Sequence, residues 1–160
     1  MKKILISLAM ICVLLTGCGK ADKPAAPVDV ELTSVMETIE NDFGNDLPMM
    51  MPADETVLQD FYGLTTEQVS DYAISLAAMN VHATEIIMVE AQEGKLEEVK
   101  AALDARMETV NSIWSTYLPD QYELVKNRKT LEVGNYLVIV IAEKADEIMK
   151  VITESLTASK

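Results

Sequence analysis

The chain has 160 residues and a formal net charge of −13 at pH 7, with 13 Lys and Arg against 26 Asp and Glu. This acidity disfavours nucleic acid and anionic lipid headgroups as partners, because both are polyanions that bind Lys and Arg. The length suits a single domain with a tether. Because 49% of the residues are hydrophobic, the chain can form a packed core without a disulfide.

The N-terminus has the layout of a lipoprotein signal. Lys2 and Lys3 precede an apolar run over 4–15, which is shorter than the ~18 residues of a membrane span. A basic start, a short apolar core and a small-residue cleavage site predict secretion. Cys18 directly after Gly17 predicts cleavage between these two residues once the thiol carries lipid. We expect a mature protein that begins at Cys18 and is held by its acyl chains, such as palmitate, at the extracytoplasmic face of the cell membrane.

Removal of the signal over 1–17 changes both the charge and the cysteine count. It takes away Lys2, Lys3 and Cys12 but no acidic residue, so the net charge falls from −13 to −15. Cys18 is then the single cysteine and carries lipid, which excludes a disulfide, a redox pair or a thiolate metal site. Residues 18–30, rich in Ala, Pro and charge, predict a flexible linker. The rest, 31–158, is predicted to be one domain.

An amphipathic helix is predicted at the start of this domain, over 31–43. Apolar residues recur there at helical spacing, and Ser34 with Glu37 forms the pattern of a capping box. Gly44 is expected to end the helix. The stretch 45–52 holds two prolines around three methionines, and we expect it to be irregular.

The middle of the domain predicts two strands between helices. A short helix is expected over 54–61. In 72–77 bulky side chains alternate with small ones, which is typical of a strand, and 85–89 is apolar on both faces. A long amphipathic helix is predicted over 96–117. A short helix over 119–124 follows, because proline is favoured in the first turn.

The last third predicts a β-hairpin and a closing helix. Residues 129–133 and 136–142 flank Gly134, which can supply the positive φ of a type II′ turn. Apolar residues at helical spacing predict a helix over 145–156. The expected fold class is therefore α+β, with a four-stranded, mainly antiparallel sheet in β-β-α-β-β-α order and an additional N-terminal helical segment.

Two of these strands, 85–89 and 136–142, are apolar on both faces. If the two long helices of the domain pack on one side of the sheet, its other face would be left in water. We expect the helix over 31–43 to cover that face. The alternatives are a second copy of the chain or a partner protein.

Several segments together resemble a known family of unknown function. They are FYGL near Phe61, DYAISLAAMNV from Asp71, ATEI from Ala83, the long helix with Arg106, YLPDQYELV from Tyr117, and VGNYLVIVIAEKADEI from Val133. With these segments the chain resembles domain-of-unknown-function family 4358 (DUF4358) over about 31–156. The resemblance implies a small lipoprotein of Gram-positive bacteria, anchored through Cys18 outside a single membrane. It implies no activity, substrate or catalytic residue.

Few residues suggest chemistry. His82 is the only histidine and has no metal-ligand spacing around it, so we expect it on the surface. Met49–Met51 could offer soft ligands to Cu(I), or serve as adaptable apolar filler in a loop that is buried or faces a partner. Glu85 and Arg106 could form a structural ion pair. General acid–base catalysis by Glu85 would need a second carboxylate nearby.

The sequence thus predicts no catalytic residue, no metal site and no cofactor. The expected function is a non-enzymatic interaction or adaptor module of the cell envelope, attached to the membrane through the lipid on Cys18, with an envelope protein as possible partner and no nucleic acid. One alternative is a lipoprotein that binds a small ligand or ion in a polar concavity near His82 or 49–51. The other is an unrecognised hydrolase.

Overall fold

The computed structural model describes residues 28–157, and the fold below refers to this range. The predicted signal, its cleavage site at Gly17–Cys18 and most of the predicted linker lie outside it. The elements are α1 (Leu32–Phe43), β1 (Met50–Pro52), α2 (Glu55–Tyr62), β2 (Val69–Ala77), β3 (Glu85–Ala91), α3 (Leu96–Trp114), α4 (Pro119–Lys126), β4 (Lys129–Val133), β5 (Tyr136–Ile141) and α5 (Ala145–Thr157). No helix of the described range is long and apolar enough to span a membrane.

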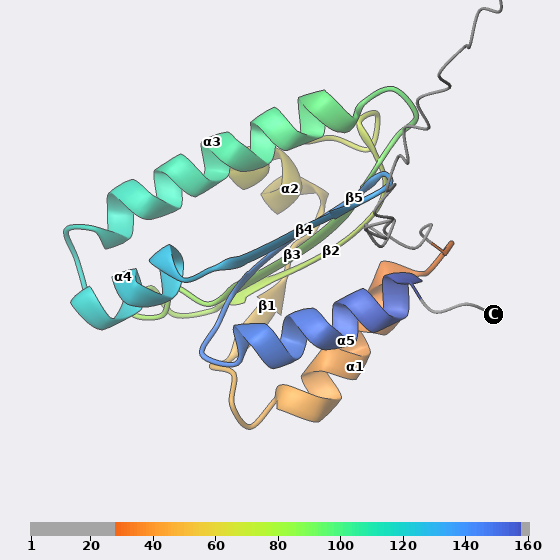
Figure 1. The fold of residues 1–160 in the computed structure, drawn as a ribbon. Helices are drawn as coiled ribbons and strands as arrows, with labels where there is room; N and C mark the ends of the chain where they lie inside the picture. Colours follow the sequence, from red (N-terminus) through yellow and green to blue (C-terminus); the bar gives the residue numbers. More distant parts are fainter. Residues whose placement is uncertain (1–27, 158–160) are drawn as a thin grey trace, which may run out of the picture.

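The strands form one antiparallel sheet in the order β1-β2-β3-β5-β4 (Figure 1). The predicted α+β class is confirmed, but the sheet has five strands and not four. The additional strand, β1, lies in the stretch predicted to be irregular, where Met50 pairs with Ala77 and Pro52 with Ser75. Three residues are too few to show a period of two, and an edge strand tolerates a proline that cannot donate a hydrogen bond.

Helices cover both faces of the sheet. Helices α2, α3 and α4 lie on one face, and α1 and α5 lie on the other (Figure 1). The central strand β3 therefore has buried side chains on both sides: Ile87 and Val89 join the core under α3, while Ile86 and Met88 join the core under α1 and α5. The sequence predicts that both faces of this apolar strand are covered, and the structure confirms it.

Helix α1 covers the second face of the sheet, as predicted, but it shares that face with α5. The expectation that both long helices pack on one side is wrong. Because α2, α3 and α4 occupy the first face, the apolar stripe of α5 is buried on the second, where Ile148, Ile152 and Leu156 are fully buried. The two ends of the described chain meet there, since the Val28 N–H donates to the Leu156 carbonyl at 2.9 Å.

The start of α1 differs from the predicted capping box. The helix begins at Leu32, two residues before Ser34, and the Leu32 N–H donates to an Asp71 carboxylate oxygen at 2.9 Å. The Ser34 hydroxyl donates to Glu31 at 3.3 Å and caps no backbone group. A carboxylate at a helix N-terminus is favourable because it faces unpaired N–H groups and the positive end of the helix dipole. Here it comes from β2, far along the chain.

The predicted hairpin of β4 and β5 is confirmed. Val133 pairs with Tyr136 across a two-residue turn, and Gly134 has a φ of 58°. Asn135 keeps a negative φ, because the described range has no positive-φ residue other than glycine. This combination agrees with the predicted type II′ turn. The turn sets the position of the first residues of β5, which line a pocket described below.

Candidate functional site

Glu85 and Arg106 form the predicted ion pair, and the pair is buried. Arg106 Nη2 lies 2.8 Å from Glu85 Oε2, and Arg106 Nε donates to Glu85 Oε1 at 3.1 Å. The two side chains are 13% and 5% exposed. The Tyr62 hydroxyl also donates to Glu85 Oε1, at 2.8 Å. The cluster joins the end of α2, the start of β3 and the middle of α3, and we refer to these three residues as the Glu85 clamp.

The charges of the clamp are matched. Burial raises the pKa of the Tyr62 hydroxyl, and the charge of Glu85 raises it further. Burial alone would lower the pKa of Arg106, but the hydrogen bonds and charge of Glu85 outweigh that effect and raise it. The guanidinium carbon lies 5.3 Å and 5.2 Å from the ring centroids of Phe61 and Tyr62, within cation–π range. Both oxygens of Glu85 already accept strong donors, so the arrangement serves to fix three elements together.

His82 lies in the loop between β2 and β3 and is half-buried, not fully on the surface as expected. It lines a small pocket of about 140 Å³ together with Asp46, Gln121 and Glu143, among others. Within residues 28–157, no group of three His, Cys, Asp or Glu side chains is close enough to hold a metal ion. This concavity is small for a ligand, since typical ligand pockets start at about 300 Å³.

The predicted methionine segment is largely exposed. Met49 and Met51 have 76% and 47% of their surface exposed, and Met79 and Val81 in the β2–β3 loop have 55% and 36%. The two stretches are adjacent, because the Met49 carbonyl accepts the N–H of Ala78 at 2.8 Å. We call Met49, Met51, Met79 and Val81 the methionine cluster. It lies at the end of the sheet where β2 turns into β3, whereas the chain enters at the opposite end, beside the end of α5 (Figure 1).

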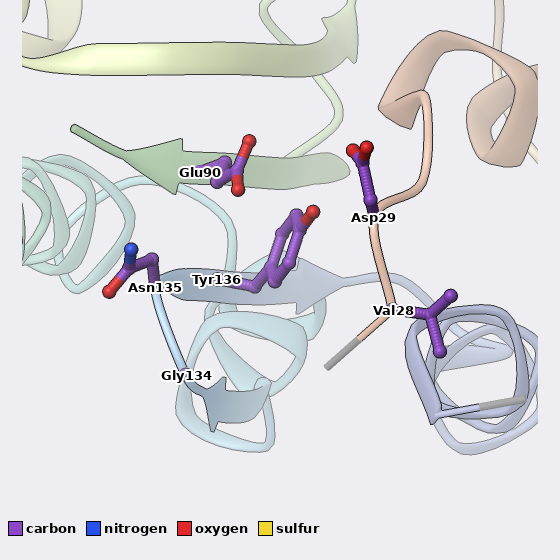
Figure 2. A pocket seen from close by; sticks show the side chains of 6 residues that line it. All are labelled: Val28, Asp29, Glu90, Gly134, Asn135 and Tyr136. Atoms are coloured by element: carbon purple, nitrogen blue, oxygen red, sulfur yellow. The ribbon is translucent and has the colours of Figure 1, made fainter. Parts of the chain in front are cut away.

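A larger pocket, which the sequence did not reveal, lies at that opposite end. It has a volume of about 340 Å³ and is lined by Val28, Asp29, Glu90, Gly134, Asn135 and Tyr136 (Figure 2). Tyr136 is 3% exposed, and its hydroxyl has no hydrogen-bond partner among the described residues. Figure 2 shows this hydroxyl at the end of the ring that points toward Glu90 and Asp29. We call this site the Tyr136 pocket.

The electrostatics of the Tyr136 pocket are those of a concentrated negative charge around a neutral hydroxyl. Burial raises the pKa of Tyr136, and the charges of Glu90 and Asp29 raise it further. The nearby backbone of Val30 lowers the pKa, with an effect second only to burial, and the closeness of the Glu90 carboxylate to the hydroxyl adds to the rise. Neither Val30 nor Glu90 makes a hydrogen bond of acceptable geometry with the hydroxyl. Glu90 is held in place because the Ser70 hydroxyl donates to its Oε2 at 2.8 Å. The pocket is thus suited to a positively charged group.

The sequence signals for this pocket were weak and scattered. Asp29 lies in the predicted linker, Glu90 near the end of a strand, and Asn135 and Tyr136 at a hairpin turn. Only the turn carried a local signal, the Gly-Asn pair. The remaining members meet because the entering chain passes over the start of β5 and contacts α5.

Comparison with known proteins agrees with the predicted family. The family described as "Domain of unknown function (DUF4358)" matches residues 44–142, well over half of the chain. This range is narrower than the expected 31–156: it contains the whole sheet with α2, α3 and α4, and it leaves out α1 and α5. No curated protein and no solved structure matches the chain. The chain belongs to the DUF4358 family of domains of unknown function.

Proposed function

We propose that the protein is a lipoprotein, anchored through Cys18 at the extracytoplasmic face of the cell membrane, and that it works there as an interaction module. In this proposal the methionine cluster docks on an apolar surface of an envelope protein. The exposed methionine cluster is the observation that carries the proposal. The signal-like sequence that ends at Gly17–Cys18 supplies the location.

The composition of the cluster suits a contact surface. Three of its four side chains are methionines, which are flexible and polarisable and adapt to irregular apolar partners. The four residues are 36–76% exposed and so leave much apolar surface in water. Grouped apolar exposure is typical of binding surfaces. Burial of this surface by a partner would be favourable.

The position of the cluster favours a protein partner over the lipid bilayer. Strand β2 is nine residues long, which corresponds to about 30 Å at ~3.3 Å per residue. Val28 lines a pocket with Glu90, which pairs with Asp71 near the start of β2. Met49 of the cluster, in contrast, accepts a hydrogen bond from Ala78, directly after the end of β2. A domain tethered through the residues before Val28 would therefore present the cluster away from its attachment point. The negative charge of the chain also disfavours contact with anionic headgroups.

The anchor is tested by comparison of the wild type with Cys18→Ser in the native host. We expect the wild type to partition into the detergent phase and its intact mass to correspond to a chain that begins at a lipidated Cys18. We expect Cys18→Ser to remain uncleaved or to be released. A wild-type protein that stays in the aqueous phase and begins elsewhere would overturn this part of the proposal.

The docking surface is tested by site-specific photocrosslinking. A photoreactive residue placed at Met79 should crosslink one defined envelope protein, and the charged double variant Met49→Glu/Met51→Glu should abolish that product. Ile113, which is 52% exposed on α3, is the matched control position and should give no such product. Equal labelling from both positions, or a crosslink only to a second copy of the chain, would contradict the proposal.

A further inference from the structure

We propose that the Tyr136 pocket binds a primary ammonium group, with the Asp29 carboxylate, the Glu90 carboxylate and the Tyr136 hydroxyl oxygen as its three acceptors. The site lies at the end of the sheet opposite the methionine cluster and is independent of the docking proposed above. Its ligand class is a small amine or a lysine side chain.

The unpartnered hydroxyl is the first observation. Buried polar groups nearly always have a hydrogen-bond partner, because an unpaired one forfeits the bonds it would make in water. Tyr136 is 3% exposed and its hydroxyl has no partner in the described range. The hydroxyl of Ser75 shares this property but lies away from this pocket. Tyr136 lines a pocket, so a bound donor could satisfy its oxygen.

The two carboxylates are the second observation. Asp29 and Glu90 line the same pocket as Tyr136, and among residues 28–157 no Lys, Arg or His forms an ion pair with either of them. Two carboxylates without a cation in a concave site attract a positive ligand. The hydrogen bond from Ser70 fixes Glu90 and leaves its other oxygen available.

The donor count favours an ammonium over a metal ion. An alkylammonium has three N–H donors and no acceptor, which matches two carboxylates and one hydroxyl oxygen. Ca²⁺ takes 6–8 oxygen ligands and relies on carboxylates, and the described residues hold no cluster of three metal-ligating side chains. The volume of about 340 Å³ also exceeds the space of a bare ion and admits a short alkyl chain beside Val28.

The main experiment is isothermal titration of the full chain, kept in a nonionic detergent, with 1,5-diaminopentane and with Nα-acetyl-lysine methylamide. Pentan-1-ol is the uncharged control ligand. We expect both ammonium compounds to bind, pentan-1-ol not to bind, and Glu90→Gln to weaken the amines by at least about tenfold. Tyr136→Phe should weaken them several-fold without a loss of thermal stability, because the hydroxyl has no partner to lose. Tyr117→Phe, at a tyrosine that is 53% exposed, is the matched control and should bind as the wild type does.

A second arm distinguishes an external amine from a lysine of the chain itself. Lys20 and Lys23 precede Val28 closely in sequence. If one of them supplies the ammonium, the wild type will not bind the amines and the double variant Lys20→Gln/Lys23→Gln will. Either source supports the proposal. The proposal would be overturned if neither the wild type nor the double variant bound either amine. It would also be overturned if Ca²⁺ bound and the amines did not.

Discussion

The Glu85 clamp allows a quantitative test of what holds the first face of the sheet together. Arg106→Met keeps most of the side-chain volume but removes both hydrogen bonds and the charge that Glu85 faces. The Glu85 carboxylate, 5% exposed, is then buried with only the Tyr62 hydroxyl as donor. Removal of one partner of a buried ion pair costs about 3–5 kcal/mol, because the other charge stays desolvated. We expect Arg106→Met to lower the free energy of unfolding by that amount.

The double variant Glu85→Gln/Arg106→Met makes the reasoning refutable. Gln at this position removes the charge and still offers an oxygen to the Tyr62 hydroxyl. The double variant should therefore be more stable than Arg106→Met by about 2 kcal/mol, although it carries one more substitution. Urea unfolding followed by the fluorescence of Trp114, the single and buried tryptophan, measures both variants. If the double variant loses as much free energy of unfolding as Glu85→Gln and Arg106→Met lose together, the two charges are not coupled.

Four further changes test other parts of the fold. Tyr62→Phe should cost about 1.5–3 kcal/mol at neutral pH, since a buried carboxylate loses a donor. The raised pKa of Tyr62 keeps the folded wild type protonated at a pH where the unfolded chain ionises, so the stability of the wild type should fall above about pH 10. The difference in stability between the wild type and Tyr62→Phe should therefore shrink there, and pH curves that stay parallel would contradict this. Ser75→Ala should leave stability unchanged or raise it by about 1 kcal/mol, because its buried hydroxyl is unpartnered, whereas Ser70→Ala loses a hydrogen bond and should not stabilise. Thermal melts compare the two variants, and a clear loss of stability in Ser75→Ala would mean that the Ser75 hydroxyl does have a partner. Ile139→Ala should cost about 2–5 kcal/mol in urea unfolding, and a neutral result would place this side chain outside the core. Deletion of 31–43 should cause aggregation or dimerisation in sedimentation, because it uncovers sheet side chains packed against α1; a monomer of unchanged stability would mean that the helix adds nothing to the fold.

Most elements could be predicted because their signals are local. The spacing of apolar residues in α3 and α5 follows the helical period, and both helices bury that stripe. Strands β3 and β5 are apolar on both faces, and each face meets its own layer of helices. The Gly134 turn is encoded in a single residue that can adopt positive φ.

The features that the sequence did not predict depend on residues far apart in the chain. The N-terminus of α1 is capped by Asp71, 39 residues away, so the local Ser34 pattern misled the prediction. Strand β1 is too short to have a visible period and is ordered by its pairing with β2. The Glu85–Arg106 pair was foreseen, but Tyr62, its third member, was not, since a tyrosine at a helix end carries no sign of the acceptor it meets. The Tyr136 pocket brings together Asp29 and a hairpin more than 100 residues later.

The packing of α1 against α5 has a consequence for the order in which the protein folds. These helices lie near the two ends of the described chain and close the second core together, with a backbone hydrogen bond from Val28 to Leu156. Contacts of such large sequence separation form late, because the loop between them must close first. A ribosome must therefore release the C-terminal helix before this core can form. If the chain is exported, as proposed above, that delay keeps the segment before α5 able to pass through a translocation channel unfolded.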